Sequence, residues 1–354
     1  MSVSLFEHPI LASHFGDEEI AAHFRIEAEI ATMLTFEMAL AEAQAQEGLI
    51  PIEASAAIAK ACEAFEPDFA ALRAGTARDG LMIPELIREL RKAVPEPHDV
   101  HLHFGTTSQD IMDTSLVMRL KAVIAIMAER LEGLVATLEA LIDTFGDNRM
   151  IGRTRMQMAM PIPARVRLKS WLTPLSRCLD ELEDIGPDLL RLQFGGAAGT
   201  LDKLGESGPA VAARLGVLLD LDVPENHWQT QRGPIIRYAN WLSLVTGALG
   251  KLGQDIALMA QNEISEIALS GGGGSSAMPH KQNPVHAESL VAFARFNATQ
   301  VAGMHQALIH EQERSGAAWA LEWMILPQMT VATGAALRLA DELLGSIERI
   351  GVAE

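Results

Sequence analysis

Residues 115–145 read SLVMRLKAVIAIMAERLEGLVATLEALIDTF, and this stretch decides the fold. It contains no proline, and its apolar residues recur at spacings of three and four, at Leu116, Leu120, Val123, Ile124, Met127, Leu131, Leu134, Leu138 and Leu141. Such spacing places them along one face of an α-helix. A helix of about 30 residues is much longer than the globular mean of about 11–12. It must bury its apolar face along its whole length, which predicts a helix bundle.

The chain on the C-terminal side of this stretch continues the pattern. Helical spacing of apolar residues extends over 235–269, 287–310 and 328–350, and prolines 161 and 163 open a further helix that reaches about residue 193. Alternating strand patterns are nearly absent. We therefore predict an all-α protein built on long helices.

The first hundred residues differ, because prolines at positions 51, 67, 84, 95 and 97 break them into short helical patterns. We expect an N-terminal helical domain over residues 1–100 and a central long-helix bundle domain over residues 101–354. The apolar faces of the long helices are too wide for one monomer to cover, so helices should also pack across subunits.

Composition narrows the function. The 354 residues are 49% hydrophobic and carry a net charge of −18, with no basic stripe to bind nucleic acid. No apolar run is long enough to span a membrane, and no signal peptide is evident. Cys62 and Cys178 fit neither a disulfide framework nor a zinc site. We expect a cytoplasmic protein.

Three polar segments interrupt the apolar pattern, and the first is His101–Asp110, HLHFGTTSQD. Its Thr106, Thr107 and Ser108 precede the first long helix, where free N–H groups and the helix dipole favour an anion. A simple helix cap by Thr or Ser is the alternative. The histidines at positions 101 and 103 could line such a site or merely flank it.

The second segment is Gly152–Pro161, GRTRMQMAMP. Arg153 and Arg155 could each hold a carboxylate through two parallel hydrogen bonds. The alternative is a solvated surface turn.

The third segment is Gly271–Pro284, GGGGSSAMPHKQNP. Four consecutive glycines cannot hold a helix, since each costs roughly 1 kcal/mol relative to Ala. Hydroxyls, a cation and an amide follow, at Ser275, Ser276, Lys281 and Asn283. This combination is typical of a catalytic lid. A flexible linker is the alternative, and the order of residues does not match a phosphate-binding P-loop.

Together the three segments resemble the fumarase/aspartase superfamily, through Thr107-Ser108, residues 152–157 and residues 274–284 in that order. The resemblance implies a fumarase/aspartase-type long-helix bundle and a homotetramer whose active sites each draw one polar segment from three subunits. It implies no metal or organic cofactor. Members usually carry a small C-terminal helical domain, which is apparently absent because the sequence stops about where it would begin.

Two stretches narrow the resemblance further. Residues 106–114, TTSQDIMDT, and residues 313–323, ERSGAAWALEW, are similar to the bacterial 3-carboxy-cis,cis-muconate cycloisomerases. This implies closure of 3-carboxy-cis,cis-muconate to 4-carboxymuconolactone in aromatic (protocatechuate) catabolism. The alternatives are an adenylosuccinate-type lyase that releases fumarate, whose Asp-x-Ser pattern after Glu-Arg is missing here, and a non-catalytic scaffold, which would gain nothing from the glycines.

The resemblance also implies roles for single residues. Ser275 matches the serine that exchanges the proton on carbon, and Ser276 is its neighbour. Lys281 is a cation that would depress the pKa of Ser275. Thr107, Ser108, Lys281 and Asn283 match positions that bind carboxylates, and Gln157 belongs to the second motif.

Arg155 departs from the lyase pattern, in which a histidine stands here and pairs with a glutamate, by position Glu288. Since Arg cannot act as a general base at neutral pH, we hypothesise that Arg155 binds a substrate anion and that Glu288 orients it. A structural ion pair between the two is the alternative. Arg153 and Arg314 are further cations for a substrate with three carboxylates, unless they form salt bridges between subunits.

Overall fold

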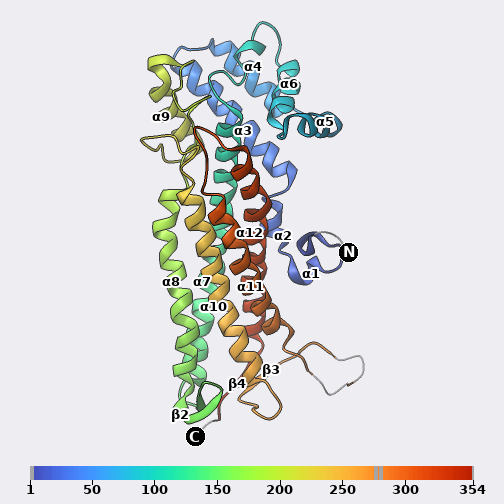
Figure 1. Ribbon diagram of the computed structural model, residues 1–354, viewed down its shortest axis with the longest axis vertical. Coiled ribbons are helices and arrows are strands. Elements are labelled where there is room, and N and C mark those ends of the chain that lie inside the picture. Colours follow the sequence, from blue (N-terminus) through green and yellow to red (C-terminus); the bar gives the residue numbers. More distant parts are fainter. Residues whose placement is uncertain (1–3, 275–277, 279–281, 353–354) are drawn as a thin grey trace.

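The computed structural model describes residues 4–274, 278 and 282–352. Five long helices run side by side along its long axis: α7 (Ser108–Phe145), α8 (Ala164–Leu189), α10 (Gly233–Met259), α11 (Val285–Gln306) and α12 (Gly316–Gly345) (Figure 1). Helix α10 packs against α8, α11 and α12, while α7 packs against α8 and α12. The predicted all-α, long-helix bundle is confirmed.

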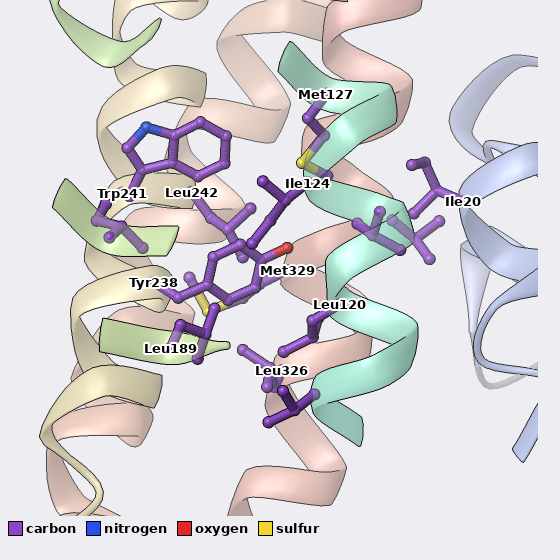
Figure 2. Close-up of a cluster of buried hydrophobic side chains, with 14 of the residues drawn as sticks. Ile20, Leu120, Ile124, Met127, Leu189, Tyr238, Trp241, Leu242, Leu326 and Met329 are labelled. Atoms are coloured by element: carbon purple, nitrogen blue, oxygen red, sulfur yellow. The ribbon is translucent and has the colours of Figure 1, made fainter. Parts of the chain in front are cut away.

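The apolar face predicted from the sequence forms the core of the bundle. All nine predicted positions of α7 are buried except Leu116, which is partly exposed. Figure 2 shows Leu120, Ile124 and Met127 of α7 meeting residues of α8, α10 and α12, with Tyr238 and Trp241 as large fillers. Lengthwise burial of these faces stabilises helices that would be marginal alone.

Shorter helices occupy the N-terminal third. They are η1 (Leu5–Glu7), α1 (Ala12–Phe15), α2 (Glu18–Ala22), α3 (Ile26–Gln46), α4 (Ile52–Glu63), α5 (Phe69–Asp79), α6 (Ile83–Ala93) and η2 (Asp99–His101). Helix α3 packs against α4, α7 and α9 (Gly208–Leu219), which follows η3 (Gly205–Ser207). Figure 1 shows α4, α5, α6 and α9 gathered at the end of the bundle where α7 begins. The division into two domains at residue 100 stays a prediction.

Two small sheets lie at the opposite end, beside the C-terminus (Figure 1). Strands β1 (Arg149–Thr154) and β2 (Gln157–Pro163) form an antiparallel hairpin, and β3 (Ile267–Leu269) pairs antiparallel with β4 (Ile347–Ile350). These strands correct three predicted helix boundaries. The 235–269 helix ends at Met259, and the 328–350 helix ends at Gly345. Pro161 lies within β2, whereas Pro163 ends β2 and is also the N-cap of α8, which ends at Leu189 rather than near residue 193.

The start of α12 is also earlier than predicted. The helix begins at Gly316 and continues through Pro327, whereas the predicted helix began at about residue 328. Proline removes one backbone donor from a helix interior and usually kinks or breaks it. Here both flanks of the proline bury apolar residues, Ile325 and Leu326 before it and Met329 after it, which holds the helix together.

We call the two ends of the bundle the Thr107 end and the hairpin end. Helix α7 connects them with 38 residues, so at about 1.5 Å per residue they lie on the order of 55 Å apart. No helix in the described part of the chain is both long and apolar enough to cross a membrane.

Candidate active site

At the Thr107 end, the first polar segment caps the longest helix. Thr107 is the N-cap of α7, with an extended backbone, and its N–H donates to Asp110 Oδ2 at 3.1 Å. The hydroxyl of Thr106 donates to the same oxygen at 3.1 Å. Thr107 and Ser108 remain partly exposed. The cap and an anion site are therefore compatible here, since the capping contacts leave both side chains within reach of a ligand.

Asp110 anchors this helix start to the loop beneath it. It is fully buried, and its Oδ1 accepts hydrogen bonds from Gln193 Nε2 at 3.0 Å and from the N–H of Gly195 at 2.9 Å. Its Oδ2 accepts from the N–H of Gly196 at 2.9 Å. Burial raises the pKa of Asp110 to about 6, although these donors favour its ionised form. These hydrogen bonds thus fix the Thr107 segment against the loop that contains Gln193, Gly195 and Gly196.

Arg314 reaches the same segment from the turn before α12. Its Nη2 donates to Thr107 Oγ1 at 3.0 Å and to the carbonyl oxygen of Ala197 at 3.2 Å, while its Nε donates to Gln109 Oε1 at 3.1 Å. The residue is exposed, so solvent also reaches it. Of the residues expected in the site, Thr107, Ser108 and Arg314 are therefore brought together within one chain. They offer two hydroxyls and a cation, which suits a carboxylate.

The two histidines beside this segment differ. His103 has a positive φ of 60°, and its Nδ1 lies 2.5 Å from Oε1 of the buried Glu37. Its ring is thus held against Glu37 of α3. His101 ends η2 and is partly exposed.

Sequence reasoning missed a buried charged group below Arg314, which we call the Arg232 cluster. Arg232 lies between Asp113 and Glu322, and Trp319 and His310 contact these two carboxylates. Asp113 and Glu322 lie in the stretches 106–114 and 313–323 that carried the resemblance, but Arg232 stands in no motif and is about a hundred positions from either carboxylate. The sequence feature that could have pointed to this cluster is the pair Gln109 and Asp113, which are four residues apart and therefore on one face of α7.

At the hairpin end, Arg153 has a partner in its own chain. Its Nη1 lies 2.6 Å from Glu266 Oε2, and Glu266 Oε1 also accepts the N–H of Ile151 at 3.1 Å. The side chain of Arg153 is 23% exposed. The structure therefore gives Arg153 an ion pair within one chain, where an ion pair between subunits had been the alternative to substrate binding.

Arg155 stands at the tip of the hairpin. It and Met156 form the two-residue turn between β1 and β2, with φ angles of 49° and 66°. Such a turn requires positive φ at both central residues and is usually built from Asn and Gly. Non-glycine residues held in this region often mark a functional site. Arg155 and Gln157 are both exposed.

The proposed partner of Arg155 is also exposed. Glu288 lies in the first turn of α11, and within the described residues it forms no ion pair with Arg155. The alternative of a structural pair inside one chain is therefore not realised, and both side chains are accessible to a substrate or to another copy.

Three candidate residues of the glycine-rich segment, Ser275, Ser276 and Lys281, are among the residues 275–277 and 279–281 that lie outside the described part of the chain. The base of the segment is described. Gly273 and Asn283 exchange two backbone hydrogen bonds of 3.0 Å, which close the excursion just before α11. Asn283 is partly exposed at this closure. The catalytic assignments for this segment remain predictions.

The largest of the cavities described among the residues 4–274, 278 and 282–352 lies away from these candidates. A cavity of about 940 Å³ between α5, α7 and α12 is lined in part by Asp113, Glu322 and Trp323, but by none of the described candidate residues. Among the residues that the structure describes, no group of three or more His, Cys, Asp or Glu side chains is placed to hold a metal ion.

The candidates thus divide between the two ends of the bundle. Thr107, Ser108 and Arg314 lie at one end, and the residues of the hairpin and of the start of α11 lie at the other. Contacts with a substrate act over about 3 Å, whereas the ends are on the order of 55 Å apart. A single chain cannot bring both sets to one small molecule.

Comparison with known proteins identifies the family. A family model described as a lyase matches residues 11–303. The chain therefore belongs to this lyase family, the fumarase/aspartase superfamily, as the three polar segments predicted.

Individual relatives are similar over most of the chain. 3-Carboxy-cis,cis-muconate cycloisomerase of Pseudomonas aeruginosa is 38% identical over 342 residues, which cover 95% of this chain and 74% of the relative. The crystal structure of 3-carboxy-cis,cis-muconate lactonizing enzyme from Pseudomonas putida matches with a TM-score of 0.91 at 35% identity, covering 97% of this chain and 77% of that one. N-acetyl-S-(2-succino)cysteine lyase of Enterococcus italicus is 31% identical over 342 residues, or 96% of this chain and 75% of the relative. Relatives named for different reactions are thus all similar to this chain.

Proposed function

We propose that this chain is a lactone-forming cycloisomerase that closes 3-carboxy-cis,cis-muconate to 4-carboxymuconolactone in the cytoplasmic catabolism of protocatechuate. Arg155 carries the proposal. A permanently charged, exposed guanidinium stands where a lyase mechanism needs a base. Lactone closure needs no such base, because the nucleophile is already an ionised carboxylate. The similarity to cycloisomerases at 33–39% identity supports the same reaction.

The reaction forms one C–O bond and one C–H bond. A substrate carboxylate oxygen adds to one carbon of an activated double bond, the π bond breaks, and a proton is delivered to the other carbon, next to a second carboxylate. Negative charge builds on that second carboxylate as it takes enediolate character. Donors aimed at those oxygens before the reaction lower the barrier most.

The residues divide the work as follows. Thr107, Ser108 and Arg314 hold one carboxylate at the Thr107 end. Arg155, oriented by Glu288, binds another, with Gln157 beside it. Ser275 exchanges the proton with carbon, and Lys281 stabilises its ionised form in a site closed to water. The remaining predicted contacts come from Arg153, Ser276 and Asn283.

This division requires several copies of the chain, and we propose a homotetramer whose active sites are shared between subunits. Enzymes of this family act on small carboxylates and typically form oligomers. The hairpin also supports the proposal, because Met156, Met158 and Met160 on one side of it are 74%, 77% and 64% exposed. Exposing such an apolar edge strand to water is unfavourable in free energy, and proteins usually cover such a strand with another part of the chain or with another subunit.

A fumarate-releasing lyase of the adenylosuccinate type is the second candidate. The similarity to N-acetyl-S-(2-succino)cysteine lyase favours it. Against it stands Arg155, which would leave the departing group without a general acid or base at this position.

An absorbance assay separates the candidates. The protein is incubated with 3-carboxy-cis,cis-muconate, with adenylosuccinate and with N-acetyl-S-(2-succino)cysteine, and the ultraviolet spectrum is followed. We expect loss of the muconate diene absorbance and no change with the other two. Turnover of a succinyl adduct alone would favour the lyase, and turnover of none would reject both enzymes.

The role of Arg155 is tested by Arg155→Met. Loss of a charge-assisted hydrogen-bonded pair should raise KM by roughly tenfold or more. Lys169→Met is the control, since it removes one exposed charge from α8. An unchanged KM in Arg155→Met would rule out the anion-binding role.

A further inference from the structure

The Arg232 cluster is a fully enclosed group of charges below the Thr107 end. Arg232 is buried, with Nη1 and Nη2 at 2.7 and 3.1 Å from the two oxygens of Asp113. Its Nε and Nη2 lie 2.8 and 2.5 Å from the two oxygens of Glu322. The planar guanidinium group of Arg232 therefore joins two carboxylates, one from α7 and one from α12. Bidentate pairs of this kind fix geometry as well as contribute energy.

The environment of Glu322 shows how tightly the group is held. Burial opposes its ionisation, but the attraction of Arg232 and of His310 outweighs burial and holds the pKa of Glu322 below its usual range. His310 Nε2 lies 3.3 Å from Glu322 Oε1 on a fully buried side chain. A buried cluster of this kind adds little net stability over apolar residues of the same size, but it permits only one arrangement of its members.

Gln109 connects this cluster to the surface. Its Nε2 donates to Asp113 Oδ2 at 3.1 Å and to the carbonyl oxygen of Gln229 at 2.8 Å. Both amide hydrogens thus face acceptors, and this leaves Oε1 to accept Arg314 Nε at 3.1 Å. The reverse orientation would set an oxygen against two acceptors and an NH₂ against a cation, so the amide has one allowed direction.

We propose that Gln109 is a positioning residue that transmits the fixed geometry of the Arg232 cluster to Arg314. Gln109 holds Nε of Arg314 and Thr107 holds Nη2, so the guanidinium plane is set before a substrate arrives. Gln109 itself is buried and does not reach the ligand. The inference rests on the proposed function only in taking Arg314 as a ligand of a substrate carboxylate. Preorganisation of this kind strengthens binding by removing the cost of ordering a long side chain.

The test compares Gln109→Met with Trp319→Phe in the full-length protein. Each change removes one donor to Asp113, since Trp319 Nε1 donates to Asp113 Oδ1 at 3.2 Å, but only Gln109 also contacts Arg314. With the substrate that the wild type turns over, we expect Gln109→Met to raise KM about tenfold with kcat within threefold, as the loss of a hydrogen bond to a charged group implies. Trp319→Phe should leave KM within twofold. It should lower the melting temperature about as much as Gln109→Met does, because each variant loses one donor to Asp113.

A double-mutant cycle with Arg314→Met separates positioning from a general structural effect. If Gln109 acts through Arg314, adding Gln109→Met to Arg314→Met changes KM no further. An additive effect would overturn the proposal, as would an equal rise of KM in Trp319→Phe.

A crystal structure of Gln109→Met supplies a readout that does not depend on the reaction. We expect the Arg314 guanidinium to leave its place beside Thr107 in this variant and to keep it in Trp319→Phe. Should the wild type turn over none of the three substrates, the proposed function fails, and this comparison still decides the positioning role. An unmoved Arg314 in Gln109→Met would refute the positioning role even if the enzyme is a cycloisomerase.

Discussion

The Thr107 end and the hairpin end hold their candidate residues in opposite ways. At the Thr107 end, Arg314 is tied to Thr107 and Gln109, and Asp110 fastens the helix start to the loop below. At the hairpin end, Arg155 and Glu288 are both exposed, and Arg155 sits on a strained turn. The first end holds Arg314 in a fixed place, which supports the anion binding that we propose for it. At the second end, Arg155 and Glu288 form no ion pair with each other, and both face solvent.

The difference follows from what each end can bury. The N-terminal helices and α9 enclose the polar residues of the Thr107 end, so every buried donor there must find an acceptor, which produces connected networks. The hairpin has only two strands, and β2 is exposed along almost its whole length. A two-stranded hairpin is marginally stable by itself, and contact with another subunit would complete it.

The largest effect is expected from mixing variants of the two ends. Arg314→Met and Arg155→Met should each lose most activity, since each variant leaves a substrate carboxylate without the cation that we propose for it, a loss of about 2 kcal/mol or more. If each site takes one end from one subunit and the other end from a second, refolding a 1:1 mixture restores intact sites. With random assembly, about a quarter of all the active sites in the mixture contain both unaltered ends. The measurement is the specific activity of the refolded mixture.

A matched mixture controls for nonspecific recovery. Arg314→Met and Ser108→Ala both alter the Thr107 end, so every site built from them contains one defect and should stay inactive. Equal recovery in both mixtures, or in neither, would mean that the two ends do not serve one shared site.

The second contrast concerns stability. Arg232→Met leaves Asp113 and Glu322 buried without their cation, and we expect a loss of about 3–5 kcal/mol in the free energy of unfolding. Arg165→Met, near the hairpin, breaks an ion pair with Asp147, whose side chain is 93% exposed. Surface pairs contribute about 0–1 kcal/mol. Urea unfolding monitored by circular dichroism measures both, and equal losses would contradict the contrast between the ends.

The long helices could be predicted from the sequence because their signal is local and repeated. Residues 115–145 carry nine apolar positions on one face, and the helix observed over Ser108–Phe145 buries all of them except Leu116, which is partly exposed. Two of the helix-boundary errors, at residues 269 and 350, fell where structure depends on distant partners. Ile267 pairs with Ile350 across more than eighty residues, and β3 has only three residues, too few to show a period of two.

The residues of the candidate site also divide into those that the sequence could reveal and those that it could not. Thr107 and Arg314 could be found because they stand in recognisable motifs, and the structure brings them together. Gln109 and Asp113 stand in the stretch 106–114 as well, but their contacts could not be predicted, and Arg232 stands in no motif, because these contacts come from enclosure by helices far apart in the sequence. A charged residue alone in a sequence is more often a surface residue than a member of a buried cluster.

A smaller effect should follow from pH at the Thr107 end. The pKa of Asp110 is about 6 in the folded chain, against 3.8 as the ordinary value. The folded state therefore holds a proton between about pH 4 and pH 6 that the unfolded state has lost, so this group's contribution to stability falls as pH rises through that range. Lowering the pH from 7.5 to 5 should stabilise the wild type by about 1 kcal/mol relative to Asp110→Asn.

The comparison uses urea unfolding of both proteins at pH 7.5, 6.5, 5.5 and 5. Other titrating groups are common to the two proteins and cancel in the difference. A gap that does not change with pH would show that Asp110 stays ionised in the folded chain over the whole range.

The smallest effect concerns two residues with positive φ, one at each end. Met156 has a φ of 66° and is 74% exposed, so little holds it in a conformation that favours glycine. Met156→Gly should raise the free energy of unfolding by about 0.5 kcal/mol, because relief of strain slightly exceeds the added chain entropy. His103 has a φ of 60° but is held by Glu37, so His103→Gly should destabilise the protein. Urea unfolding of both variants tests this, and a gain in His103→Gly would mean that the Thr107 end is held no more firmly than the hairpin end.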